Sequence, residues 1–88
     1  MEAGGAAIGL PESLVGCSFT KCDLRRWSFD RKNLAGADLS DSDLSEATFQ
    51  GARLEKAHLA RAILTGADFT KAMLQDADLA AARIDRCR

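Results

Sequence analysis

Large apolar residues recur at every fifth position along nearly the whole chain. The series begins at Leu14, ends at Ile84 and has fifteen members without a gap. A small residue stands two positions before most of them, as Ala37 stands before Leu39. The large residues are Leu14, Phe19, Leu24, Phe29, Leu34, Leu39, Leu44, Phe49, Leu54, Leu59, Leu64, Phe69, Leu74, Leu79 and Ile84.

A period of five fits neither regular element of secondary structure. On an α-helix, successive members would drift by about 140° and surround the helix. On a flat strand, an odd step would send alternate members to opposite faces. A chain that bends after each unit of five avoids both problems. The pattern therefore predicts short extended segments, each with its large and its small residue pointing inward and the other three pointing out.

The phenylalanines indicate how many such segments make one coil. Phe29, Phe49 and Phe69 are twenty residues apart, which is four units. Four sides per coil would stack these rings in one column, whereas three sides would scatter them. Phe19 is off this column. The other three columns would be Leu14/Leu34/Leu54/Leu74, Phe19/Leu39/Leu59/Leu79 and Leu24/Leu44/Leu64/Ile84.

The five-residue units resemble the pentapeptide-repeat family, whose pattern is A-[DN]-[LF]-x-x. The units that match it best are Ala37-Asp38-Leu39-Ser40-Asp41, Ala67-Asp68-Phe69-Thr70-Lys71 and Ala77-Asp78-Leu79-Ala80-Ala81. The resemblance covers residues 12–88 and implies an all-β fold, a right-handed quadrilateral β-helix with four pentapeptides per coil. Residues 1–11, rich in Ala and Gly, are expected to be a flexible lead-in or a partial N-terminal cap, with Ile8 and Leu10 as an apolar plug.

Composition places few further limits on the chain. Its 88 residues allow one domain, and a solenoid builds its core locally, coil by coil. The net charge of −1 gives no overall attraction to nucleic acid or to an anionic membrane. No apolar stretch is long enough for a transmembrane helix, and no secretory signal is evident. We expect a cytoplasmic protein that binds neither nucleic acid nor membrane directly.

The units between Glu12 and Lys32 are irregular at the small inward position. Bulky Trp27 and charged Lys32 occupy it, and burying an unpaired lysine is costly. The pattern therefore predicts a coil that is distorted, bulged or widened there. A second interpretation is that Trp27 is an exposed anchor for a partner, because aromatic residues are favoured at interfaces.

No catalytic, metal or cofactor site is evident in the sequence. His58 is expected at an outward, solvated position without a nucleophile beside it, and acid–base catalysis needs paired groups. An enzyme that uses His58 is the weakest of the functional hypotheses. Cys17, Cys22 and Cys87 share the inward position and lack a C-x-x-C spacing, so we expect reduced core thiols and no zinc site.

Charged residues form two clusters of opposite sign. The acidic cluster consists of Asp38, Asp41, Asp43 and Glu46 and surrounds one corner of the second coil. The basic cluster precedes it in the chain, beside Trp27. Together they could orient a partner or a head-to-tail neighbour along the axis. The candidate partner-binding residues are Trp27, Asp38, Asp41, Asp43 and Glu46. The basic cluster is Arg25, Arg26, Arg31 and Lys32.

The repeat continues to Cys87 and Arg88 without a closing helix, so the last coil is expected to present strand edges and core side chains. This end would meet a partner or another copy, or the chain is part of a larger effector or scaffold. The leading hypothesis is therefore a non-catalytic structural or protein-interaction module. The alternative, implied by the family resemblance, is a DNA-mimicking protein that binds DNA gyrase or another topoisomerase. A mimic needs one acidic face, and no side of the coil carries charge of one sign.

Overall fold

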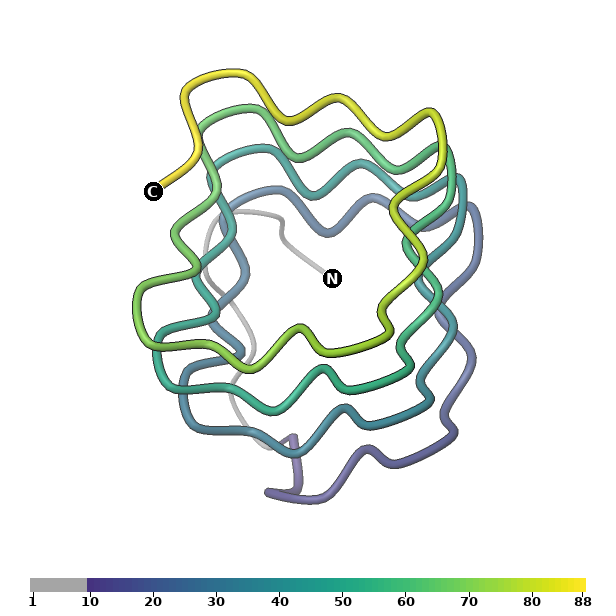
Figure 1. The fold of residues 1–88 in the computed structure, drawn as a ribbon, viewed down its shortest axis with the longest axis vertical. Coiled ribbons are helices and arrows are strands. Elements are labelled where there is room, and N and C mark those ends of the chain that lie inside the picture. The colour runs from purple at the N-terminus through teal and green to yellow at the C-terminus, as the bar shows by residue number, and fades with distance from the viewer. Residues whose placement is uncertain (1–9) are drawn as a thin grey trace.

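In a computed structural model that describes residues 10–88, the chain winds into a right-handed four-sided β-helix of nearly four coils (Figure 1). The all-β fold that the family resemblance implies is thereby confirmed. Residues 10–88 contain no helix, and hence none that could cross a membrane. Ile8 and most of the predicted lead-in lie outside the described residues.

Parallel β-bridges twenty residues apart join each coil to the next. They recur at every fifth residue, at the position just before each large apolar residue. A repeat of twenty residues requires four units per coil, as the phenylalanine spacing predicts. The bridges are Ser13↔Asn33, Ser18↔Asp38, Asp23↔Asp43, Ser28↔Thr48, Asn33↔Arg53, Asp38↔His58, Asp43↔Ile63, Thr48↔Asp68, Arg53↔Met73, His58↔Asp78 and Ile63↔Arg83.

Backbone hydrogen bonds tie each unit to both neighbouring coils. In a typical unit, the amide of Leu34 donates to the carbonyl of Arg53 in the next coil at 2.7 Å. The amide of Asn33 donates in the other direction, to the carbonyl of Glu12 at 2.8 Å. Because the same bonds recur at each step of five, each coil presents a regular edge to the coil that follows it.

Each corner is a tight turn that contains a residue in the left-handed region. In the turn that follows Leu34, Gly36 has φ +68°, and the amide of Ala37 donates to the carbonyl of Leu34 at 2.9 Å. A positive φ at the third residue of such a turn is the mark of a type II turn. Glycine also occupies this position at residues 16, 51 and 66. Eleven other corners have the same φ without glycine: Lys21, Arg26, Arg31, Asp41, Glu46, Lys56, Arg61, Lys71, Asp76, Ala81 and Arg86.

The Asp or Asn side chain of the repeat motif accepts a hydrogen bond from a backbone amide that has no backbone acceptor. The side chain of Asn33 accepts a hydrogen bond from the amide of Ala35 at 3.1 Å, and Asp38 accepts one from the amide of Ser40 at 3.0 Å. Asp43, Asp68 and Asp78 do the same two residues ahead. The motif thus places an acceptor where the chain turns outward.

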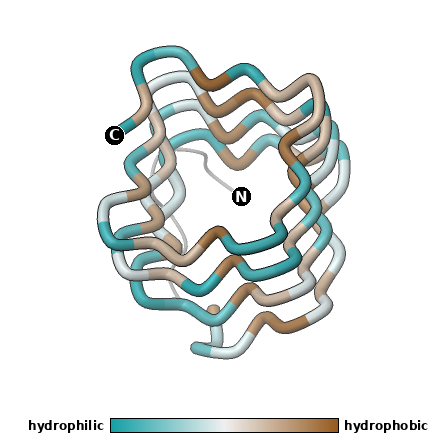
Figure 2. Tube along the Cα trace, in the orientation of Figure 1, coloured by the Kyte–Doolittle hydropathy of each residue, from teal (hydrophilic) through white to brown (hydrophobic). Residues whose placement is uncertain are grey.

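Hydrophobic residues of successive coils lie above one another along the walls of the tube (Figure 2), and their buried side chains form the core. Phe29, Phe49 and Phe69 stack with ring centroids 5.0 and 4.9 Å apart and nearly parallel planes, which confirms the predicted column. Alanines at the small position are fully buried beside them from residue 37 to residue 67. One small position is polar. The buried hydroxyl of Ser42 donates to the carbonyl of Phe19 and accepts from the amide of Cys22 at 3.1 Å.

The distortion predicted near Trp27 and Lys32 is absent, because bridges and corner dihedrals continue through this region. Trp27 is buried, with 8% of its surface exposed, and stacks on Phe29 at a centroid distance of 6.0 Å. No complete coil precedes it among residues 10–88, so the indole has room at the end of the tube. The half-buried Lys32 donates from Nζ to the carbonyl of Leu10 at 3.0 Å, which gives its charge a partner.

Candidate interaction surfaces

The acidic cluster predicted to bind a partner includes a carboxylate that is already paired. Arg61, one coil further along, donates from Nε and Nη2 to the two carboxylate oxygens of Asp41 at 2.8 and 3.0 Å. This two-point contact lowers the pKa of Asp41, because it stabilises the charged form. A bidentate pair of this kind leaves Asp41 little net charge to offer to a partner.

The basic cluster neutralises two further members of the acidic cluster. Arg26 lies 3.7 Å from the carboxylate of Glu46, and Arg25 lies 3.9 Å from that of Asp43. Both pairs are exposed to solvent. The two clusters that could orient a partner along the axis therefore interact with each other, across neighbouring coils. Whether the acidic residues or Trp27 bind a partner stays a prediction, although the buried Trp27 is not the exposed anchor that this hypothesis assumed.

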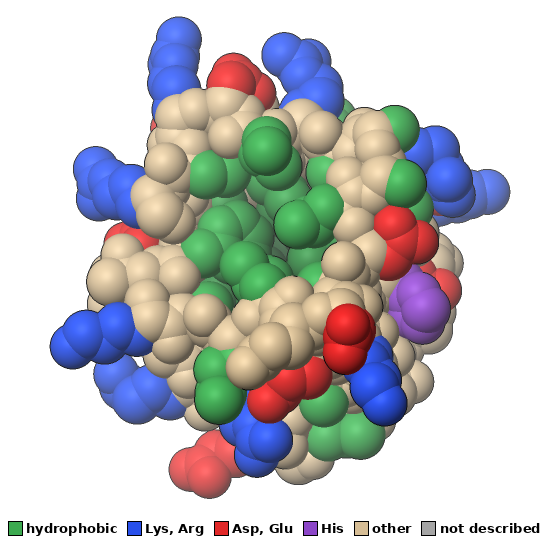
Figure 3. All heavy atoms as spheres, in the orientation of Figure 1, with side chains coloured by type: hydrophobic (Ala, Val, Ile, Leu, Met, Phe, Trp, Pro, Cys, Tyr) green, Lys and Arg blue, Asp and Glu red, His purple; other side chains and the backbone are tan. Residues whose placement is uncertain are grey.

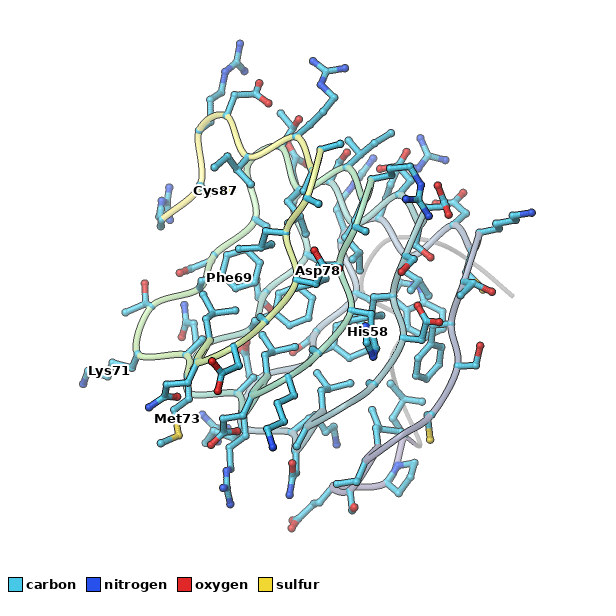
Figure 4. The ribbon with its side chains drawn as sticks, turned by 45° about the vertical axis from the view of Figure 1, so that its right-hand side comes forward. His58, Phe69, Lys71, Met73, Asp78 and Cys87 are labelled. Atoms are coloured by element: carbon cyan, nitrogen blue, oxygen red, sulfur yellow. The ribbon has the colours of Figure 1, made fainter. Side chains whose placement is uncertain are left out.

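His58 is exposed on the side wall between two aspartates. It forms parallel bridges with Asp38 in the coil before it and Asp78 in the coil after it (Figure 4). The pKa of Asp38 is lowered, mainly by hydrogen bonds from Ser40 and to a smaller degree by His58. Among residues 10–88, no three side chains of His, Cys, Asp or Glu come together in a geometry that could hold a metal ion.

The three cysteines are reduced and half-buried, at the inward positions that the sequence predicts. They pack against the hydrophobic core. Cys87 donates from Sγ to the carbonyl of Leu64 at 3.0 Å, and burial raises the pKa of its thiol. A thiol with a raised pKa is a poor nucleophile at neutral pH.

The end of the tube formed by residues 69–88 is open and apolar. Leu79 and Ile84 expose 37% and 58% of their surfaces, although equivalent residues in the middle coils are fully buried. Figure 3 shows hydrophobic side chains around a hollow at the centre of this end. We call this surface the open end. It is lined by Leu64, Phe69, Leu74, Leu79, Ile84, Cys87 and Arg88.

The first coil differs from the open end. Leu14, Leu24 and Trp27 are all buried there, although no complete coil precedes them among the described residues. Leu10 packs against this core, and its carbonyl accepts the hydrogen bond from Lys32. Within residues 10–88, the core of the first coil is therefore less exposed than that of the open end, although Phe19 in the first coil is only half-buried.

Comparison with known proteins identifies the family to which this repeat belongs. A family model for pentapeptide repeats (eight copies) matches residues 13–55 and 52–88. The chain belongs to the pentapeptide-repeat family. A search of curated proteins gave no match.

Two solved pentapeptide-repeat proteins resemble this one over most of its length. The first is HetL from the cyanobacterium Nostoc sp. strain PCC 7120, described as involved in heterocyst differentiation regulation. It is 28% identical, with a TM-score of 0.77, over 80% of this chain and 30% of HetL. The second comes from the thylakoid lumen of Arabidopsis thaliana. It is 30% identical, with a TM-score of 0.80, over 96% of this chain and 61% of the plant protein.

This pentapeptide-repeat chain thus spans less than two thirds of the length of either structure. The location of the plant protein is a property of that protein, and a cytoplasmic location for this chain stays a prediction.

One feature of the surface was not found by sequence reasoning. The ion pairs between coils could have been, because Arg26 and Glu46, like Asp41 and Arg61, are twenty residues apart and residues at this spacing stack. The exposure of core side chains in the last coil was predicted from the sequence, and the structure shows it at Leu79 and Ile84.

Proposed function

We propose that this pentapeptide-repeat chain is a non-catalytic protein-interaction module, and that the open end is its contact surface. The observation that carries the proposal is the exposure of Ile84 and Leu79, which belong to the same columns as fully buried leucines. Apolar surface that is gathered in one place and accessible to water favours association. Membership of the pentapeptide-repeat family also supports a structural role. The rest of the tube is a regular repeat.

The side walls offer a weaker contact surface. Their charges are of mixed sign, and several are paired between coils, as Asp41 is with Arg61. Exposed pairs of this kind contribute little to binding energy. The same pairing weakens the DNA-mimic alternative, which needs a continuous acidic face. No feature of the described residues favours that alternative over the open end.

An apolar fluorescent dye, 8-anilinonaphthalene-1-sulfonate, tests whether the open end is available. We expect dilute protein to enhance the fluorescence of the dye and Ile84→Glu to abolish the enhancement, because a carboxylate would enter the apolar hollow. Met73→Glu is the matched control, because Met73 is exposed on a side wall away from the hollow. Circular dichroism confirms that both variants fold. Fluorescence that is absent with the wild-type protein, or equal in Ile84→Glu, overturns the proposal.

A further inference from the structure

We infer that the corner formed by Arg31, Gly51 and Lys71 binds a carboxylate from an acidic segment of a partner protein. This inference goes beyond the open end, because the corner lies on the side of the tube and spans three successive coils. Three observations support it: two cations that form no ion pair, a depression between them, and a second corner at which the chain itself supplies the carboxylate.

The corner carries two cations and no acid. Arg31, Gly51 and Lys71 stack at intervals of twenty residues, and each has a φ between 59° and 66°. Arg31 and Lys71 are exposed, and Lys71 points outward from the tube (Figure 4). Within residues 10–88, neither cation forms an ion pair. Each of the other three corner columns includes an acidic residue.

The glycine leaves a depression between the two cations. Its volume is about 280 Å³, and it is lined by Arg31, Gln50, Gly51, Thr70 and Lys71. A Cβ added to Gly51 would lie 3.4 Å from Cγ of Arg31, so the aliphatic stem of the arginine passes beside the glycine. Because residue 51 has no side chain, a group from another molecule can enter between the two cations.

The uncharged residues of the depression are held in place by the side wall. Gln50 donates from Nε2 to the carboxylate of Asp68 at 2.7 Å, and Thr70 donates from Oγ1 to the same carboxylate. Asp68 is buried by these contacts, with 8% of its surface exposed. Asp30 accepts a hydrogen bond from the backbone amide of Gln50 at 2.9 Å. Among residues 10–88, no acidic side chain lines the depression.

The corner of Lys21, Asp41 and Arg61 shows what such an arrangement holds. Its three residues have the same spacing, with a carboxylate between two cations. Arg61 donates to both carboxylate oxygens of Asp41 at 2.8 and 3.0 Å, and Lys21 adds a weaker attraction. The two corners match in their cations and differ in the middle, where Gly51 stands in place of an aspartate. A carboxylate from another molecule can complete the second corner in the same way.

A protein segment fits this corner better than a free carboxylate ion. Exposed ion pairs are individually weak, so a single carboxylate would dissociate readily from an open depression. A segment with several acidic side chains keeps a carboxylate close to the two cations. Charge complementarity of this kind orients a partner on a surface.

A fluorescein-labelled hexaglutamate peptide tests the inference. Fluorescence anisotropy at low ionic strength measures its dissociation constant, and amide correlation spectra of the ¹⁵N-labelled protein locate it. We expect binding that weakens as salt is added, because the contact is exposed and electrostatic. The largest changes in chemical shift should occur at Arg31, Gly51 and Lys71. A hexaglutamine peptide should not bind.

Two pairs of variants separate this corner from the overall charge. Gly51→Asp supplies the carboxylate from within the chain and should weaken peptide binding at least about fivefold. Gly36→Asp, at a glycine corner with φ +68°, makes the same change in net charge and should stay within about twofold of the wild-type affinity. Lys71→Gln should weaken binding, whereas Lys21→Gln removes the same charge beside an aspartate and should not. Circular dichroism confirms that all four variants fold.

Three results would overturn the inference. The first is a peptide that does not bind at low ionic strength, and the second is equal weakening by Gly51→Asp and Gly36→Asp. The third is a thymidine oligonucleotide that binds this corner more tightly than the peptide, because the site would then take phosphate. None of these results depends on dye binding at the open end, so the inference and the proposed function fail separately.

Discussion

The corner residues show how this fold uses backbone conformation. Fifteen residues from Gly16 to Arg86 share a positive φ between 57° and 74°, and only four of them are glycine. A side chain in this region costs about 1–2 kcal/mol. This cost is offset because the backbone amides of corner residues donate hydrogen bonds to carbonyls of the next coil. The amide of Lys56, for example, donates to the carbonyl of Gln75 at 2.9 Å.

Exchanging glycine and alanine at two corners measures this cost. Ala81→Gly should stabilise the protein by about 1 kcal/mol, because it relieves the strain at φ +59°. Gly36→Ala should destabilise it by about 1–2 kcal/mol, and no atom within 4 Å would clash with the new methyl group. Urea unfolding followed by circular dichroism measures both. Equal stability of the two variants would show that the corners are not strained.

Ser42 is a second residue whose role is local. Its buried hydroxyl joins the carbonyl of Phe19 to the amide of Cys22, in place of the direct turn bond seen at other corners. Ser42→Ala should therefore destabilise the protein by about 1–3 kcal/mol, since two buried polar groups lose their partner. Ser18→Ala, at an exposed position, is the control. If the two variants have the same urea midpoint, the turn at Phe19 closes without the hydroxyl.

At the scale of one unit, the period of five was sufficient to predict the inward columns and the number of sides. It did not predict that Trp27 would be buried without distorting its coil, because the room around a side chain depends on the neighbouring coil. Nor did it predict lysine, arginine and glutamate at left-handed corners, since only four of the corners carry glycine, the residue that favours that conformation. These features depend on which coils lie above and below each unit, and the repeat alone does not specify that.

Aspartates of the motif, together with Asp85 outside it, make the stability of the fold depend on pH. Hydrogen bonds from Thr70 and Gln50 lower the pKa of Asp68 from its usual 3.8 to about 2, and hydrogen bonds from Ser40 and Thr65 lower those of Asp38 and Asp85. A pKa that is lower in the folded than in the unfolded chain stabilises the fold above the unfolded value. This stabilisation is lost as pH falls through the folded value.

We therefore expect the melting temperature to be nearly constant from pH 7 to about 5 and to fall between about pH 4 and 2. Asp68→Asn should make this fall shallower and lower the melting temperature at pH 7, because the amide cannot replace both interactions of the carboxylate. Asp76→Asn, at an exposed corner, is the control. A wild-type melting temperature that does not fall below pH 4 contradicts this role for the motif aspartates.

At the scale of the whole molecule, each coil serves as the template for the next. The middle coils have neighbours on both faces, which is why their leucines are fully buried. The coil of residues 69–88 has one such neighbour within the described residues, and its exposed apolar face follows from that. The proposed interaction depends on this difference between the middle coils and the coil of residues 69–88.

Amide hydrogen exchange, resolved residue by residue in dilute protein, tests this difference most directly. The amides of Leu34, Leu39 and Leu44 donate to the next coil at 2.7 Å, whereas those of Leu74, Leu79 and Ile84 have no next coil within residues 10–88. We predict slow exchange for the first three and fast exchange for the last three. Equal protection of the two sets would contradict the account, because it would mean that the edge of the last coil is covered in the single chain.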